Sequence, residues 1–144
     1  MPANIQSFTN PFINPDPFKV LIYDSNRTAL NNTKDKVLKS GFYNVFSETD
    51  RKESITAITQ HNPQVVITDH RLNDGMDAID FVAALRRFSN VPVVIWGSRL
   101  QEKTETSLLS LRKVYTLCSK DGIFTLQDIL QRLKMMKKNP DLWA

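Results

Sequence analysis

The clearest hydrophobic pattern in the chain is the run from Val65 to Thr68, which leads directly into Asp69. These four residues are apolar or β-branched, and a continuous run of this kind is typical of a strand that is buried on both faces of a sheet. A turn-forming stretch at residues 73–75 follows. We therefore expect Asp69 to lie where a central strand leaves the sheet, at the centre of a polar site.

Four other segments have strand character. Three are apolar runs and one alternates between apolar and polar positions, and a proline enters one of the apolar runs near its start. The predicted strands are 19–23, 43–47, 65–68, 91–96 and 114–118.

In the segments between these strands, apolar residues recur at the spacing of an α-helix. The first helix is predicted to end at Gly41, in the position after the C-cap, and the second to close before Pro63. A weaker helix is expected over residues 102–111. The other apolar faces are formed by Leu30, Val37 and Leu38; by Ile55, Ala57 and Ile58; by Ile79, Val82 and Leu85; and by Leu126, Ile129, Leu130, Leu133 and Met136.

The alternation of strand and helix predicts an α/β fold: a three-layer, doubly wound, five-stranded parallel sheet of flavodoxin-like type, with strand order 2-1-3-4-5. Ligands of such sheets bind beyond the carboxyl ends of the strands. The polar groups expected at those ends are Asp24, Asp69, the pair Gly97-Ser98, and Lys120. We predict that they meet around one crevice.

This set of groups suits phosphoryl chemistry. Two neighbouring carboxylates repel unless a cation or a proton lies between them, and hard oxygen ligands in a wet crevice suit Mg²⁺. A carboxylate such as Asp69 can act as a nucleophile towards phosphorus. The metal and Lys120 would neutralise charge on the transferred group, and Ser98 could hydrogen-bond one of its oxygens.

Composition limits the alternatives. The chain has 144 residues, a formal net charge of +4 and a single cysteine. Its basic residues are scattered, which argues against nucleic-acid binding. No apolar run approaches the roughly 18 residues that a membrane helix needs, and no signal peptide is visible. We expect a protein that is soluble and cytoplasmic, without a disulfide framework.

One domain is expected, over residues 19–138. Residues 1–18 contain four prolines and are predicted to form a flexible N-terminal leader, or an arm whose aromatic residues dock on this domain or on a partner. Residues 139–144 are predicted to form a C-terminal tail that includes Trp143.

Five motifs in this order resemble the receiver domain of bacterial two-component response regulators, the chemotaxis-regulator fold. The resemblance spans about Lys19 to Lys138. The matching segments are Val20–Asn26 with its acidic end, Val65–Asp69, the loop Arg71–Asp77, Val91–Ile95, and the lysine loop Ser119–Gly122.

The resemblance implies a role for each site residue. Asp69 would be the phosphoacceptor, and Asp24, Asp69 and the main-chain carbonyl of Arg71 would hold Mg²⁺. Lys120 would contact the phosphoryl group, with Ser98 or Gly97 near it. Such domains are not enzymes in the usual sense, although they slowly dephosphorylate themselves.

The partners implied are a sensor histidine kinase or phosphotransfer protein and an unknown downstream target, with neither nucleic acid nor membrane. The target would bind the surface of the fourth helix, fifth strand and fifth helix, and a homodimer is left open.

Three positions depart from the family pattern. Ser25 stands where a second acid is usual, which should weaken Mg²⁺ binding. Gly97 occupies the usual threonine or serine position, so the Ser98 hydroxyl comes one residue late, and Asp121 replaces a common proline.

Two alternatives therefore accompany the phosphoacceptor hypothesis. One is a degenerate pseudo-receiver that acts as a phosphorylation-independent protein interaction module. The other is a flavodoxin-like or nucleotide-binding enzyme, which the sequence after the first strand disfavours because residues 24–28 contain no phosphate-binding loop.

Overall fold

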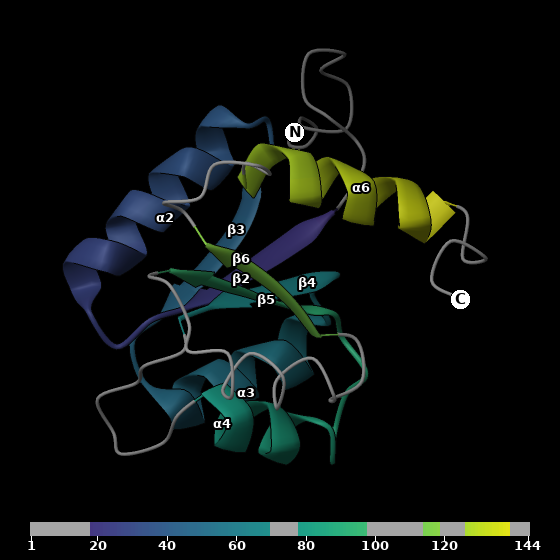
Figure 1. Ribbon diagram of the computed structural model, residues 1–144. Coiled ribbons are helices and arrows are strands. Elements are labelled where there is room, and N and C mark those ends of the chain that lie inside the picture. The colour runs from purple at the N-terminus through teal and green to yellow at the C-terminus, as the bar shows by residue number, and fades with distance from the viewer. Residues whose placement is uncertain (1–17, 70–77, 98–113, 119–125, 139–144) are drawn as a thin grey trace, which may run out of the picture.

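The computed structural model describes residues 18–69, 78–97, 114–118 and 126–138. Strands and helices alternate along this part of the chain (Figure 1). In chain order the elements are β2 (Lys19–Tyr23), α2 (Arg27–Lys39), β3 (Asn44–Glu48), α3 (Arg51–His61), β4 (Val65–Thr68), α4 (Ala78–Leu85), β5 (Val93–Gly97), β6 (Val114–Cys118) and α6 (Leu126–Lys138).

The five strands form one sheet in the order β3-β2-β4-β5-β6, and every neighbouring pair is parallel. In order of sequence this is 2-1-3-4-5, so the predicted topology is confirmed. The bounds of β2, β4 and β6 agree with the prediction, while β3 begins and ends one residue later than expected. β5 begins at Val93 instead of Val91, because Pro92 has no N–H to give to the ladder.

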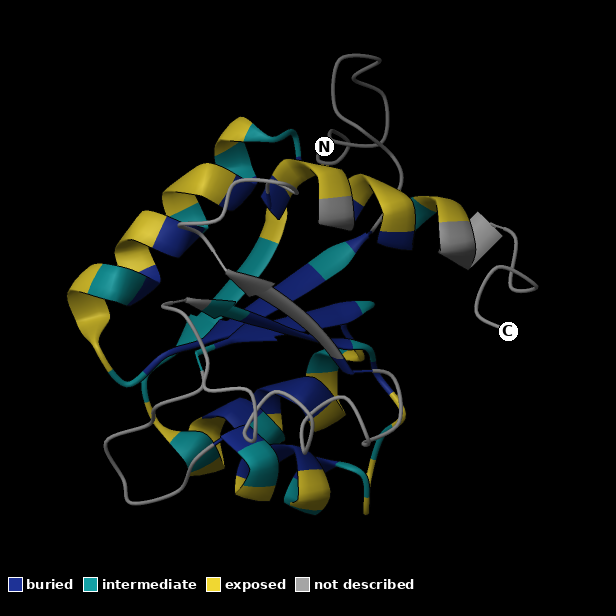
Figure 2. Ribbon diagram, in the orientation of Figure 1, coloured by how far each residue is buried: buried dark blue, intermediate teal, exposed yellow. Residues whose placement is uncertain are grey.

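Side chains on the two faces of the sheet form two separate cores. The first lies on the α3/α4 face and contains Leu21, Tyr23, Val66, Phe81, Leu85, Val93 and Ile95 among others. The second lies on the α2/α6 face and contains Val20, Ile22, Leu30, Val37, Ile67, Val94, Leu130 and Leu133 among others. Figure 1 shows α2 and α6 on one side of the sheet and α3 and α4 on the other, and Figure 2 shows buried residues concentrated between these layers.

The ends of α2 and α3 follow from local sequence. Asn26 caps the start of α2 and Asp50 caps the start of α3, each through a side-chain oxygen that accepts a backbone N–H of the first turn. Gly41 follows the C-cap of α2 with φ +94°, a conformation that favours glycine, so its predicted role is confirmed. Asn62 takes the left-handed conformation after α3, just before Pro63.

Several predictions concern residues outside the described part of the chain. These are the helix expected over 102–111, the leader up to residue 17 and the tail 139–144. Phe18, which we assigned to the leader, is buried and packs against Phe42 with 5.4 Å between ring centroids. No helix in the described ranges is both long and apolar enough to cross a membrane.

Candidate functional site

Asp24 follows β2 directly and is held by hydrogen bonds to its neighbours. Its backbone N–H donates to the carbonyl of Glu48 at 3.2 Å, which extends the contact between β2 and β3 by one residue. One of its carboxylate oxygens, Oδ1, accepts the backbone N–H of Asn26 at 2.9 Å. The residue is only 8% exposed. The carboxylate therefore has a defined position at the carboxyl edge of the sheet.

The surroundings of Asp24 disfavour its charged form. Burial raises the pKa of Asp24 and is the largest effect; the Asn26 N–H lowers this pKa, and the charge of Asp69 raises it further. The net result is a pKa above the usual range of an aspartate. A bound cation would act in the opposite direction, since it stabilises the carboxylate form.

Asp69 lies beside Asp24 because the strands that precede them are in register. Tyr23 of β2 pairs with Thr68 of β4, so the next residue of each strand leaves the sheet at the same height. Both carboxylates line one hollow of about 440 Å³, and Asp69 is partly exposed there. The predicted meeting of these two carboxylates is thus observed.

The N-terminal end of α2 forms the other wall of this hollow. Asn26 Oδ1 accepts the backbone N–H of Ala29 at 2.9 Å, and the Asn26 carbonyl accepts that of Leu30 at 2.9 Å. The partial positive charge of a helix N-terminus attracts anions. From this side the hollow is lined by Ser25, Asn26, Thr28, Ala29 and Asn32.

The donor set fits a hydrated Mg²⁺ ion. Two hard carboxylate oxygens face an open and mostly polar hollow, and Mg²⁺ usually keeps several waters beside one or two carboxylates. Ser25 also lines the hollow and contributes a neutral hydroxyl where a second acid would contribute charge. Within the described ranges no group of three or more His, Cys, Asp or Glu residues is placed to hold a metal. Asp24 and Asp69 would hold the ion, which would supply positive charge to a phosphoryl group.

Four of the predicted site residues lie outside the described part of the chain: Arg71, Ser98, Lys120 and Asp121. Their expected roles stay predictions. Gly97 is the last residue of β5 and pairs with Cys118 of β6, so its backbone lies at the same edge of the sheet as the two carboxylates.

Sequence reasoning did not identify four residues that line this site: Asn26, Thr28, Ala29 and Asn32. Asn26 fixes both Asp24 and the first turn of α2, and Thr28 and Asn32 extend the wall along the helix. Asn before a run of helical periodicity is a cap signal, so Asn26 was detectable. Thr28 and Asn32 are exposed helix positions whose sequence carries no signal of a site.

Solved receiver structures have the same fold as this chain at low sequence identity. A chemotaxis protein from Vibrio cholerae aligns with a TM-score of 0.64 at 18% identity, covering 81% of this chain and 96% of that one. A two-component response regulator from Clostridium difficile aligns with a TM-score of 0.70 at 16% identity, covering 85% and 98%. The receiver domain of a Francisella response regulator gives a TM-score of 0.66 at 22% identity, covering 85% and 98%.

Sequence comparison leads to the same group of proteins. An uncharacterized response regulatory protein of Staphylococcus epidermidis is 33% identical over 72 residues, which are 47% of this chain and 29% of that protein. The match thus spans less than a third of the relative's length. The response regulator receiver domain family matches residues 20–136, from the first strand to the last helix. On this match, the chain belongs to the receiver domain family of two-component response regulators.

Proposed function

We propose that Asp69 accepts a phosphoryl group, and that the chain works as a receiver in a two-component phosphorelay. The observation that carries this proposal is the placement of Asp24 and Asp69 side by side in one hollow at the carboxyl edge of a parallel sheet. Receiver domains typically bind Mg²⁺ at such an acidic site and take their phosphoryl group from a histidine kinase or phosphotransfer protein.

The chemistry of the proposed step balances without a further reagent. A carboxylate oxygen of Asp69 attacks phosphorus, and a new O–P bond forms while the P–N bond of a donor phosphohistidine breaks. The electron pair of the broken bond stays on the imidazole nitrogen, which then takes up a proton. The partial positive charge at the start of α2 favours the anionic product. Asp24 would hold the cation, and Lys120 would contact the transferred group.

Incubation with Mg²⁺ and acetyl phosphate tests this function directly. We expect the intact mass to increase by one phosphoryl group, and hydroxylamine to remove it because the product is an acyl phosphate. Asp69→Asn should abolish the product. The matched control Asp128→Asn, which changes an exposed carboxylate on α6, should leave it unchanged. A wild-type signal that persists in Asp69→Asn would exclude the proposed acceptor.

The second candidate function is a pseudo-receiver that binds proteins without phosphorylation. Two observations favour it: Ser25 supplies no charge to the hollow, and the raised pKa of Asp24 opposes a second carboxylate charge. It predicts that wild type and Asp69→Asn bind the same partners equally in a pull-down. Magnesium-dependent phosphorylation of Asp69 would exclude it.

The remaining proposals concern organisation and partners. We assign residues 19–138 to the receiver domain, with a leader at 1–18 whose last residue, Phe18, packs against the domain, and a tail at 139–144, in a cytoplasmic protein. A sensor kinase or phosphotransfer protein would donate the phosphoryl group. The downstream target would bind the surface of residues 102–111, β6 and α6, and the chain could also form a homodimer.

A further inference from the structure

The strand next to Asp69 carries a large aromatic residue at the height of the site. In the register of β4 and β5, Ile67 pairs with Val94 and Thr68 with Ile95, so one further residue places Asp69 beside Trp96. Side chains alternate between the two faces along a strand. Trp96 therefore projects to the face that Val94 shares with Ile67, which is the α2/α6 face. The hollow places Asp69 on the same side, because its other wall is the first turn of α2.

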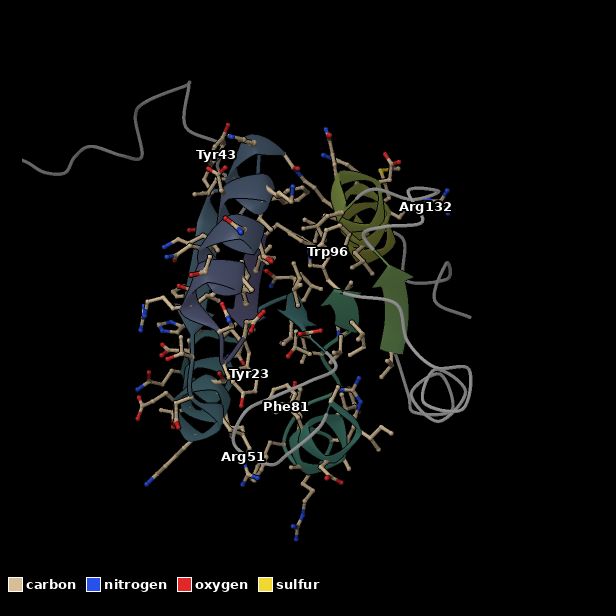
Figure 3. All side chains as sticks on the ribbon, turned by 60° about the vertical axis from the view of Figure 1, so that its left-hand side comes forward. Tyr23, Tyr43, Arg51, Phe81, Trp96 and Arg132 are labelled. Carbon is tan, nitrogen blue, oxygen red and sulfur yellow. The ribbon has the colours of Figure 1, made fainter. Side chains whose placement is uncertain are left out.

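Trp96 also belongs to the core beneath α6. It is partly buried and packs against the second core, to which α6 contributes Leu126, Leu130 and Leu133. Figure 3 shows Trp96 in the space between α2 and α6. One side chain thus connects the strand position beside Asp69 with the core that α6 covers. On β5, Ile95 gives a comparison: it is fully buried in the first core, on the opposite face.

We propose that Trp96 couples the charge at the Asp24–Asp69 site to the packing of α6, as a positioning residue; this inference rests on the proposed function. A phosphoryl group on Asp69 adds both volume and negative charge next to the strand position of Trp96. Close-packed cores transmit a displacement instead of absorbing it. A phosphoryl group on Asp69 therefore displaces the indole towards Leu130 and Leu133, and α6 becomes less stable.

Hydrogen exchange of the α6 amides, measured by NMR with Mg²⁺ and the phosphoryl mimic beryllofluoride, tests this coupling. In wild type we expect Leu130 and Leu133 to exchange about tenfold faster in the adduct, which is within the range for overpacking a core. In Trp96→Leu the response should disappear although ¹⁹F NMR still shows the adduct. The matched control Ile95→Val, on the opposite face, should keep it.

Each outcome bears on the inference. If the Trp96→Leu adduct gives the same α6 response as wild type, the coupling is wrong while the proposed function stands. If wild type forms no adduct by ¹⁹F NMR, both fail together. If Trp96→Leu does not fold, Trp143→Phe leaves Trp96 as the single tryptophan, and adduct formation must then change its fluorescence emission. An unchanged emission would overturn the inference.

Discussion

The two faces of the sheet have similar apolar cores, but different residues follow these cores at the carboxyl edge. On the α3/α4 face the core continues up to the ring of Tyr23, which lies 4.9 Å from that of Phe81 (Figure 3). On the α2/α6 face the core residues of β2 and β4 end at Ile22 and Ile67. The positions that follow on this face are Asp24 and Asp69, which open into the hollow.

Strand alternation explains this difference. Consecutive residues of a strand point to opposite faces, so an aspartate placed one residue after Tyr23 or Thr68 falls on the α2/α6 face. The two carboxylates thereby lie on one side of the sheet, while the end of β2 on the other side is covered by the aromatic pair of Tyr23 and Phe81. We expect substitutions on the α3/α4 face to change stability alone, and substitutions on the α2/α6 face to change stability and the site together.

The largest effect should come from removing a buried ring on the α3/α4 face. Phe81 is completely buried, so Phe81→Ala should lower the free energy of unfolding by about 3–5 kcal/mol, through lost burial and the cavity that remains. Urea unfolding measures this loss. Mg²⁺ affinity, measured by titration of the folded protein, should stay at the wild-type value.

Leu130→Ala provides the matched substitution on the other face. Leu130 is also completely buried, and its loss should cost about 2–5 kcal/mol. Here the adduct with beryllofluoride should also become tighter, because Leu130 shares a core with Trp96 and its removal leaves room for the displaced indole. Equal adduct affinities in the two alanine variants would contradict the difference between the faces.

The sequence predicted the sheet and its central carboxylates because both depend on patterns that are local. Apolar runs define the strands, alternation with helices defines their parallel order, and the end of each strand is visible as a change to polar residues. The position of Trp96 beside Asp69 was not predictable in this way. It depends on the stagger of β5 against β4, and β5 begins at Val93 instead of Val91.

The rest of the predicted site is expected in the segments that follow the strands. Arg71, Ser98 and Lys120 follow strands at positions that the sequence indicates by resemblance, but they lie outside the described ranges. Loop geometry depends on turn type and tertiary contacts more than on hydrophobic period, so spacing alone does not fix where such side chains point. Asn26 differs, because a cap is a local feature.

A smaller effect than these core substitutions should come from restoring the missing acid at residue 25. Ser25 lines the hollow beside Asp24, so Ser25→Asp adds a charged oxygen where a cation would bind. We expect Mg²⁺ affinity to rise about tenfold, equivalent to about 1.4 kcal/mol. Isothermal titration calorimetry measures the change. Ser40→Asp, at the opposite end of α2, serves as the control and should leave the affinity unchanged.

The two helix caps allow a smaller and closer comparison. Asn26 and Asp50 make equivalent bonds at the starts of α2 and α3, each 2.9 Å long. Asn26→Ala and Asp50→Ala should each lower the free energy of unfolding by about 1 kcal/mol. Only Asn26→Ala should also weaken Mg²⁺ binding, because Asn26 lines the hollow. Weaker Mg²⁺ binding in both variants to the same extent would show that the effect is not specific to α2.

The smallest effect concerns the charge of Asp24 in the metal-free protein. Burial and the neighbouring Asp69 raise the pKa of Asp24 in the folded state. Between the ordinary pKa and this raised pKa, the folded protein binds more protons than the unfolded chain, so the free energy of unfolding falls as pH rises through that interval. The penalty is complete above the raised pKa and absent below the ordinary one.

Asp24→Asn should therefore increase the melting temperature in EDTA at neutral pH. This increase should be smaller than the decrease caused by removing a helix cap. The increase should fade as pH falls through the same interval. The asparagine oxygen can still accept the Asn26 N–H, so the bond that orients this side chain is retained. With saturating Mg²⁺ the order should reverse, because only wild type offers both carboxylates to the cation. If Asp24→Asn melts below wild type in EDTA at neutral pH, the Asp24 carboxylate stabilises the metal-free fold. That result would contradict the unfavourable free energy of burying this charge.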